Sequence, residues 1–442
     1  MELSDYMIKF FLCNNECWMY DAYNNKILQL SKDAYCDLKR MLNEPEHSSK
    51  YITSLKRKDY FKEDIIKSLE NPYTKYADKI VHRNLKSLTL QVTQSCNFRC
   101  RYCSYAFNST SSRYHNNKKM SWDIAKKSLD YAIENSPDSS ELNIAFYGGE
   151  PLLCFNLIKK CVQYAKERIV NKKVVFSMTT NFYSLTDEMI WFIVENNFRI
   201  LISLDGPEEI QNNHRRLSSD GSGTFNQVID NIIKLKLFQP IFFENNVQFN
   251  PVVFYDEDPN KILDFFKTQL GVAQSNIQLQ RVDETGLAIS YDTPTLTDKE
   301  LNEGIFNAPV ISHYKKVLRN RNKISSNYHI NGSCVPGADK LFVSTDGTFY
   351  PCEKANECNE CMQIGSLNSG INIDKIKYLM NIGYMNQKKC KKCWAIRFCK
   401  ICCVNCDDGE SKLSQELMEN KCKDTRLYVL KYLKKCIKEN SI

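Results

Sequence analysis

The stretch CNFRCRYC occupies residues 96–103 and follows, after three residues, the candidate β-strand Leu88–Val92, in which apolar and polar residues alternate. Its CxxxCxxC spacing places three thiols, Cys96, Cys100 and Cys103, in one short loop. Three thiolates can bind three irons of a [4Fe–4S] cube and leave the fourth iron without a protein ligand. A structural zinc site needs four ligands, and no fourth ligand follows at zinc-finger spacing. The loop therefore favours a cluster with one iron open for chemistry over three ordinary buried thiols.

Strand-like and helix-like segments alternate on both sides of this loop, over residues 86–290. The predicted strands are Leu88–Val92, Asn143–Phe146, Val174–Met178, Ile200–Leu204, Val247–Val252 and Ile277–Val282, and the helices between them include Trp122–Ile133 and Phe225–Leu235. This alternation predicts an α/β fold of parallel βα units, either an open sheet or a partial barrel. In both arrangements the active site is expected at the carboxyl ends of the strands.

This core resembles the radical S-adenosylmethionine (AdoMet) superfamily. Tyr102 takes the aromatic position of the family's CxxxCxφC signature, and the segment at 148–151 reads GGEP, a further family motif. The resemblance covers about residues 86–285. It implies AdoMet contacts from Tyr102, Gly148, Gly149, Glu150, Asn181, Ser203, Arg215 and Leu279.

The resemblance also implies a fold and a chemistry. The fold is a partial (β/α)6 barrel whose [4Fe–4S] cluster binds AdoMet at its open iron. One electron from the cluster then cleaves the sulfonium and gives a 5′-deoxyadenosyl radical. The cofactors carry the difficult chemistry, while the protein positions them and excludes competing reactions.

The carboxyl-terminal part, residues 331–442, is rich in cysteine. Twelve of the twenty cysteines lie at or after Cys334, a density that favours metal or cluster ligation in a reducing compartment. Their order, with a Gly-x4-Cys step and a Cys-x2-Cys-x5-Cys-x3-Cys run, resembles the SPASM extension of radical AdoMet enzymes that modify peptides and proteins. The resemblance implies two auxiliary [4Fe–4S] clusters, the first held by Cys334, Cys352 and Cys403 and the second by Cys390, Cys393, Cys399 and Cys422.

The first auxiliary cluster lacks a fourth ligand in this assignment. Cys358 or Cys361 would supply it, or one iron would stay open for a substrate thiolate. A zinc ribbon built from Cys358/Cys361 and Cys390/Cys393 is the alternative, but it leaves the remaining cysteines unexplained.

Residues 1–80 read as a separate small unit of three strands followed by helices. The strands are predicted at Ile8–Leu12, Cys17–Tyr20 and Ile27–Leu30, with a helix capped by Ser31 and a second helix over Lys62–Leu69. The unit resembles the winged-helix-like RiPP recognition element, which binds the leader of a ribosomally made precursor peptide as an added strand. A structural cap on the barrel is the plainer interpretation. Residues 291–330 are expected to form a helical bridge.

These features predict a peptide maturase of the sactipeptide or ranthipeptide type. It would join a cysteine sulfur to a carbon of another residue in a Cys-rich precursor, with flavodoxin or ferredoxin as electron donor. Carbon–carbon crosslinking or epimerisation would use the same core.

The second hypothesis is an anaerobic sulfatase-maturating enzyme, which makes formylglycine. Those enzymes carry an Asp base directly after the Gly-x4-Cys cysteine, where this chain has Glu353. Glu353 is therefore either a catalytic base or a solvent-facing carboxylate paired with a neighbouring lysine. A third hypothesis, a non-catalytic iron–sulfur or zinc scaffold, does not explain the open three-thiol loop beside GGEP.

Composition predicts a cytoplasmic protein. The 43% hydrophobic and 25% charged residues are typical of a soluble globular protein, no apolar run approaches the length that spans a membrane, and no signal peptide is apparent. The net charge of +8 is scattered along the chain, so neither a nucleic-acid partner nor a membrane partner is expected.

Overall fold

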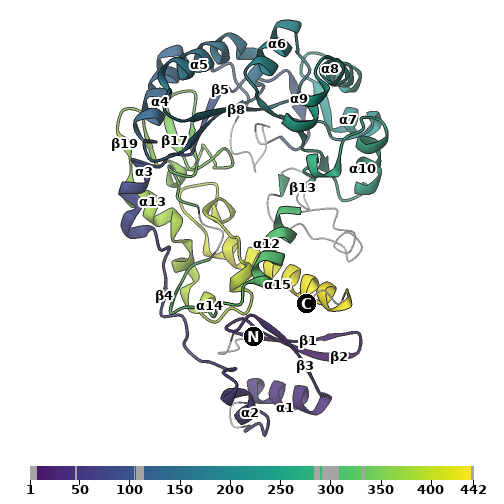
Figure 1. Cartoon of the computed structure of the whole chain (residues 1–442), viewed down its shortest axis with the longest axis vertical. Coiled ribbons are helices and arrows are strands. Elements are labelled where there is room, and N and C mark those ends of the chain that lie inside the picture. Colours follow the sequence, from purple (N-terminus) through teal and green to yellow (C-terminus); the bar gives the residue numbers. More distant parts are fainter. Residues whose placement is uncertain are drawn as a thin grey trace.

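The computed structural model describes residues 7–44, 47–103, 105, 114–282, 289–290, 308–330 and 334–439. Figure 1 shows an arc of strands and helices at one end, the carboxyl-terminal part in the middle and the amino-terminal sheet at the other end. The long helix α15 (Gln415–Lys438) lies between the arc and that sheet.

The amino-terminal sheet is an antiparallel meander. Its strands are β1 (Ile8–Cys13), β2 (Glu16–Asp21) and β3 (Lys26–Leu30), in that order. Asn14 and Asn25 stand in the turns with φ of 52° and 53°, a left-handed conformation that asparagine tolerates. Helix α1 (Lys32–Asn43) begins at Ser31, whose Oγ accepts a hydrogen bond from the Ala34 N–H at 3.2 Å. These strands and this cap appear where the sequence predicts them.

The second predicted helix, Lys62–Leu69, is wrong. The structure has a helix earlier in the chain, α2 (Ile52–Arg57). Positive φ values at Asp59, Phe61 and Asp64 prevent this helix from continuing to Leu69. The apolar residues that suggested a helix face pack instead into the main core, and β4 (Ser68–Leu69) pairs in parallel with β15 (Asn327–Tyr328). Strand β4 thus pairs with the segment that follows helix α12 (Ala308–Arg319) and not with the amino-terminal sheet.

The central part is a parallel α/β sheet whose helices lie on its outer face, as Figure 1 shows. Its strands are β5 (Ser87–Thr93), β7 (Glu141–Gly148), β8 (Lys173–Thr180), β9 (Arg199–Ile202) and β11 (Val247–Phe249), adjacent in chain order. The helices are α3 (Ala77–Val81), α4 (Trp122–Glu134), α5 (Phe155–Arg168), α6 (Asp187–Glu195), α7 (Glu208–His214), α8 (Phe225–Phe238), α9 (Pro240–Asn246) and α10 (Pro259–Thr268). Buried side chains of these strands and helices make up the main core.

The arc continues past β11 through a break in the ladder. The predicted strand Val247–Val252 is divided into β11 and β12 (Val252–Val253) around Pro251, which has no N–H to donate. Strand β13 (Gln280–Val282) pairs in parallel with β12, and a parallel bridge joins Phe249 to Ile277. Strand β14 (Ile289–Ser290) lies antiparallel to β13. The result is an α/β fold with a partial-barrel-like mixed sheet.

The carboxyl-terminal part extends the same sheet. Strand β16 (Leu341–Val343) pairs in parallel with β5, and β17 (Thr348–Tyr350), β18 (Gly365–Ser366) and β19 (Gly370–Ile371) follow antiparallel. Within the described residues this gives one nine-stranded sheet. The remaining elements include α12 (Ala308–Arg319), α13 (Ile373–Met380), α14 (Gln387–Cys390) and the short 3₁₀ turns Ile396–Phe398 and Cys403–Cys406. Helix α12 lies in the predicted bridge, of which residues 291–307 are outside the described residues.

The amino-terminal sheet packs on the cysteine-rich part. Arg397 is buried and donates through Nη2 to the carbonyl oxygens of Tyr23 and Asn322, at 2.8 and 2.7 Å. The rings of Tyr20 and Phe398 lie 5.8 Å apart. The sheet therefore rests on the loop that carries Cys393 and Cys399.

Among the helices of the described residues, none has both the length and the apolar composition needed to cross a bilayer.

Candidate active site

A cavity of about 830 Å³ is lined by residues along the parallel strands, and their carboxyl ends carry most of the predicted site residues in it. Predicted residues that line it are Cys96, Cys100, Tyr102, Cys103, Gly148, Gly149, Asn181, Ser203 and Arg215, together with Glu353 from the carboxyl-terminal part. Two predicted AdoMet contacts are buried outside this lining: Glu150 is 1% exposed and Leu279 is 6% exposed. The glutamines on either side of Leu279, Gln278 and Gln280, line the cavity in its place. The cavity thus brings one cysteine loop and several separate strand ends together.

Close packing between two backbones explains the Gly-Gly pair. The N–H of Gly149 donates to the Thr93 carbonyl, and the N–H of Glu150 donates to the Ser95 carbonyl, both at 2.9 Å. A Cβ on Gly149 would stand 2.2 Å from the Ser95 oxygen, and one on Gly148 would stand 2.0 Å from the Thr93 oxygen. The pair therefore lets the end of β7 hold the segment that leads into the cysteine loop.

Glu150 ties two strand ends together beneath the cavity. Its carboxylate accepts hydrogen bonds from the N–H of Leu152 at 2.9 Å, the hydroxyl of Thr180 at 2.8 Å and the N–H of Asn181 at 2.7 Å. Burial raises its pKa to about 7, against the lowering effect of these bonds. The side chain fixes the place of Asn181, and its predicted contact with AdoMet stays a prediction.

Each sulfur of the cysteine loop has N–H groups beside it. The contacts are Phe98 N at 3.3 Å and Asn181 Nδ2 at 3.9 Å for Cys96, Arg215 Nη1 at 3.8 Å for Cys100, and Tyr105 N at 3.4 Å for Cys103. The Cys103 sulfur also lies 3.8 Å from His115 Nε2. N–H groups around the sulfurs of an iron–sulfur cluster stabilise its thiolate ligands and tune its potential. Burial raises the pKa of the Cys100 thiol to about 12, although the charge of Arg215 opposes this. Three soft donors, their N–H partners and the adjoining cavity fit a [4Fe–4S] cluster with an open iron.

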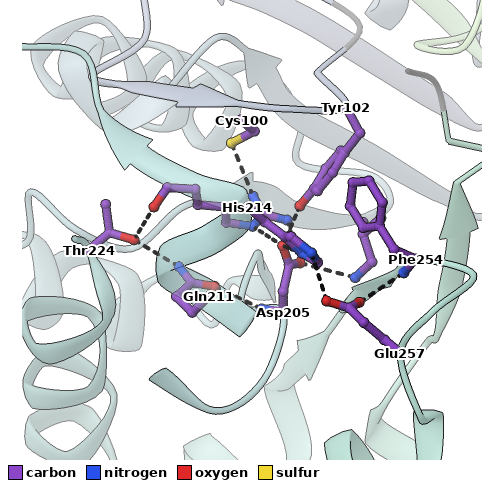
Figure 2. Close-up of polar contacts among 10 residues, drawn as sticks. Cys100, Tyr102, Asp205, Gln211, His214, Thr224, Phe254 and Glu257 are labelled. Carbon is purple, nitrogen blue, oxygen red and sulfur yellow. Dashed lines mark hydrogen bonds and ion pairs between the residues drawn. The ribbon is translucent and has the colours of Figure 1, made fainter. Parts of the chain in front are cut away.

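A buried group of charged residues stands behind Cys100, and Asp205 is at its centre (Figure 2). Asp205 is fully buried and forms a bidentate salt bridge with Arg215. The Nε and Nη2 atoms of Arg215 each donate to a carboxylate oxygen of Asp205 at 3.0 Å. The Tyr102 hydroxyl donates to it at 2.6 Å, and the His214 Nδ1 lies 3.2 Å away. Burial alone would raise the pKa of Asp205, but the charge of Arg215 and the bond from His214 outweigh it and lower the pKa to about 2.

Sequence reasoning did not single out Asp205 or His214. Asp205 stands in an SLDG turn at the end of β9, where an acidic residue reads as ordinary turn chemistry. His214 follows nine residues later at the end of α7. Only the antiparallel pairing of β10 (Arg215–Leu217) with β6 (Phe98–Cys100) brings them to the cysteine loop.

The carboxyl-terminal cysteines fall into two groups, and within each group neighbouring thiols raise one another's pKa. In one, Cys390 has its pKa raised first by burial and then by the neighbouring thiols of Cys393, Cys422 and Cys399. This is the predicted second auxiliary set. In the other, burial and then Cys352 and Cys402 raise the pKa of Cys334 to about 12.

Cys402, which directly precedes Cys403, is thus a member of this group that the sequence analysis does not place among the ligands. It raises the pKa of Cys403 as well as those of Cys334 and Cys352, whereas the charges beside Cys361 are those of Asp407 and Asp408. Within the part of the chain that the structure describes, no three Cys, His, Asp or Glu side chains converge at the distances of one metal ion. The thiols of a cube bind different irons, so their sulfurs need not converge on one point.

Glu353 lies at the mouth of the cavity and is paired with a lysine. The ion-pair partner is Lys340, the residue directly before β16, at 2.8 Å, and the charge of the adjacent Lys354 also acts on the carboxylate. The Glu353 side chain is 22% exposed. Burial raises its pKa, but the charge of Lys340 outweighs burial and the net shift is downward. A base role stays a prediction.

Residues 90–268 match the model of the Radical SAM superfamily. The uncharacterized protein MJ0907 of Methanocaldococcus jannaschii is 37% identical over 28% of this chain and 40% of its own length, so the chain spans less than half of that relative. The radical SAM cyclopropyl synthase TigE of Paramaledivibacter caminithermalis is 24% identical over 72% of this chain and 68% of that protein. A cysteine-type anaerobic sulfatase-maturating enzyme of Clostridium perfringens is 23% identical over 75% and 92%.

A solved structure shares the fold. It is native anSMEcpe with bound AdoMet and Cp18Cys peptide, with a TM-score of 0.55 and 21% identity. The match covers 79% of this chain and 97% of that one.

Proposed function

Because the chain is a radical SAM enzyme, related to maturases of peptides and sulfatases, we propose that it modifies a ribosomally made, Cys-rich precursor peptide. The product we propose is a thioether between a cysteine sulfur and a carbon of another residue. The observation that carries this proposal is the single cavity on which the three-thiol loop, the Gly-Gly strand end and the carboxyl-terminal part converge.

The cofactors of the chain are AdoMet and a [4Fe–4S] cluster, which Cys96, Cys100 and Cys103 would hold. Together they supply a carbon-centred radical that removes hydrogen from an unactivated C–H bond. The protein's own part is to hold the sulfurs with N–H donors and to enclose the reacting groups. Ser203 and Arg215, which line the cavity, are proposed to bind AdoMet.

In the proposed reaction one C–H and one S–H bond are lost and one C–S bond forms. One hydrogen atom goes to the deoxyadenosyl radical, the thiol proton goes to a base, and the surplus electron goes to an auxiliary cluster. Cys390, Cys393, Cys399 and Cys422 are proposed to hold one auxiliary cluster. Cys334, Cys352 and Cys403 are proposed to hold the other, with Cys402 as the fourth ligand.

We propose that the precursor's leader adds to the outer edge of β3. Strand addition needs an edge whose backbone groups are not already paired. In the described residues the ladder contacts of Lys26–Leu30 are with β2, and β1 is the strand at the other edge of this sheet. Helix α1 and the apolar cluster of Ile8, Met19, Leu38, Tyr60 and Phe61 stiffen this sheet.

Formylglycine formation on a sulfatase is the second candidate, because a sulfatase-maturating enzyme is 23% identical over 75% of this chain. Glu353 would be the base in that reaction. The two functions differ in product: a thioether removes two hydrogens from the peptide, whereas formylglycine removes the cysteine sulfur.

The first test is anaerobic. The reconstituted full chain, reduced with dithionite, is expected to convert AdoMet to 5′-deoxyadenosine, and the Cys96→Ala/Cys100→Ala/Cys103→Ala variant is expected not to. Equal background from both proteins, with iron present in the wild type, would reject radical chemistry at this loop.

The second test addresses the β3 edge. Along a strand, neighbouring N–H groups point to opposite sides, so of Leu28→Pro and Gln29→Pro one removes an N–H from the open edge and the other breaks the ladder with β2. The edge variant is expected to fold and to lose binding of a precursor leader measured by fluorescence anisotropy. Unchanged binding by a folded edge variant would reject this docking mode.

A further inference from the structure

The two sides of the Arg215 guanidinium face different partners. Nε and Nη2 each donate to the Asp205 carboxylate at 3.0 Å, while Nη1 lies 3.8 Å from the Cys100 sulfur. The backbone supports this arrangement, because Arg215 stands directly opposite Cys100 in the β10–β6 pair. The side chain therefore connects one carboxylate to one sulfur.

Asp205 is held so that it cannot change orientation. Besides Arg215, its carboxylate accepts hydrogen bonds from the Tyr102 hydroxyl at 2.6 Å and from the Val252 N–H at 3.0 Å. Its own backbone N–H donates to Gln211 Oε1 at 2.9 Å. Figure 2 shows these bonds converging on Asp205 from several elements. A carboxylate held in this way fixes the rotamer of the arginine that it pairs with.

A second ion pair balances the first. His214 lies between Asp205, at 3.2 Å, and Glu257, at 2.9 Å, and only 1% of its side chain is exposed. Glu257 in turn accepts the Phe254 N–H at 2.8 Å. Burial lowers the pKa of His214, but the hydrogen bonds and charges of Asp205 and Glu257 outweigh it and raise this pKa to about 9. At neutral pH two carboxylates thus face two cations.

We infer that Asp205 is a positioning residue that holds the Arg215 donor on the Cys100 sulfur and thereby raises the reduction potential of the iron–sulfur cluster. The inference rests on the proposed function, because it requires Cys100 to be a cluster ligand. A hydrogen bond to a ligand thiolate withdraws electron density from the cluster and favours its reduced state. Reduction of the cluster is the step that must precede AdoMet cleavage.

The sign of the change in reduction potential in an Asp205→Asn variant distinguishes a positioning role of Asp205 from a purely electrostatic effect of its charge. Asp205→Asn removes a negative charge close to the cluster, which by itself would make the potential more positive. The same change releases Arg215 from its bidentate salt bridge, and the loss of the N–H···S contact would make the potential more negative. Positioning therefore predicts a negative shift in a variant that a charge effect alone would shift positively.

The experiment is an anaerobic, EPR-monitored redox titration of the full reconstituted chain without AdoMet. The signal of this cluster is identified by its loss in the Cys96→Ala/Cys100→Ala/Cys103→Ala variant. The matched control is Asp138→Asn, because Asp138 makes the same bidentate salt bridge with Arg83 at 2.8 and 2.8 Å, on the surface. We expect a more negative potential for Asp205→Asn and the wild-type potential for Asp138→Asn. An unchanged or more positive potential for Asp205→Asn would overturn the inference.

A second variant decides the question if Asp205→Asn does not assemble the cluster. Arg215→Lys keeps the positive charge but lacks the planar fork that reaches the carboxylate and the sulfur together. A more negative potential supports the inference, and the wild-type potential overturns it. Absence from the wild type of any signal that depends on the three cysteines would instead reject the proposed function.

Discussion

Arg397 donates to the carbonyl oxygen of Tyr23 at 2.8 Å, across 374 residues of sequence. The same guanidinium reaches Ala22 and Asn322, so one buried cation satisfies three backbone acceptors. Arg397 lies between Cys393 and Cys399 in the loop proposed to hold the second auxiliary cluster. The position of the amino-terminal sheet is therefore coupled to the order of this loop.

We predict that Arg397→Met loosens the amino-terminal sheet. Each hydrogen bond from a charged donor contributes about 1.5–3 kcal/mol, and the substitution leaves three backbone carbonyl groups, including that of the buried Ala22, without this donor. Hydrogen–deuterium exchange is expected to rise in β1–β3 while the parallel strands β7 and β8 stay protected. Arg83→Met, which removes a half-exposed arginine, is the control and is expected to change neither region. Equal exchange in β1–β3 of Arg397→Met and wild type would contradict the coupling.

Removal of the clusters should affect the same sheet. Metal ligation couples to folding, and the loop around Cys393 and Cys399 has few regular elements of its own. We predict that anaerobic chelation of the iron increases exchange in β1–β3 more than in β7 and β8. Exchange that rises equally everywhere would indicate global unfolding instead.

Gly149→Ala is predicted to disturb the cysteine loop. The new Cβ would stand 2.2 Å from the Ser95 oxygen and 3.1 Å from the Cys96 Cβ, so the backbone before the loop must move. Overpacking of this kind costs about 1–3 kcal/mol. We expect lower stability and loss of the EPR signal that depends on Cys96, Cys100 and Cys103.

The control for this change is Gly383→Ala, whose Cβ would have its nearest neighbour, the Leu69 Cβ, at 3.9 Å. It is expected to keep both stability and signal. A Gly149→Ala protein with the wild-type signal would show that the close approach is not required.

The fourth prediction concerns the first auxiliary cluster. Because Cys402 lies in the group of Cys334 and Cys352, Cys402→Ser is expected to lower the iron content as Cys352→Ser does, by up to about four irons per chain. Cys358→Ser and Cys361→Ser are expected to keep it. Iron and sulfide analysis after reconstitution is the measurement. Full iron in Cys402→Ser together with loss in Cys361→Ser would return the assignment to Cys361.

The parallel core was predictable because its signals are local. Leu88–Val92 is a segment of strand length with alternating apolar and polar residues. Ser121 precedes helix α4 as an N-cap, and its Oγ accepts a hydrogen bond from the Ile124 N–H at 3.2 Å. The cysteine spacing likewise fits into one loop. Such patterns depend on neighbours within a few residues, and the structure places them as expected.

Long-range pairing was not predictable in the same way. The link between Arg215 and Cys100 depends on a strand pair of three residues each, separated by more than a hundred positions. The helix predicted over Lys62–Leu69 was wrong because a local pattern was taken for a helix face. Ile66 and Leu69 are buried in the main core, and residues with positive φ prevent a helix. Short strands and irregular segments take their form from tertiary contacts, which no local pattern contains.

The pairing of β16 with β5 has a consequence for synthesis. On the ribosome, β5 gains its partner β7 early, but its other edge stays open until residues 341–343 have left the exit tunnel. An open, apolar strand edge is a template for pairing with other chains. A fragment that ends with the parallel core would carry this edge permanently, so expression of that core alone would favour aggregation. The carboxyl-terminal part thereby covers an edge of the parallel core in addition to carrying cysteines.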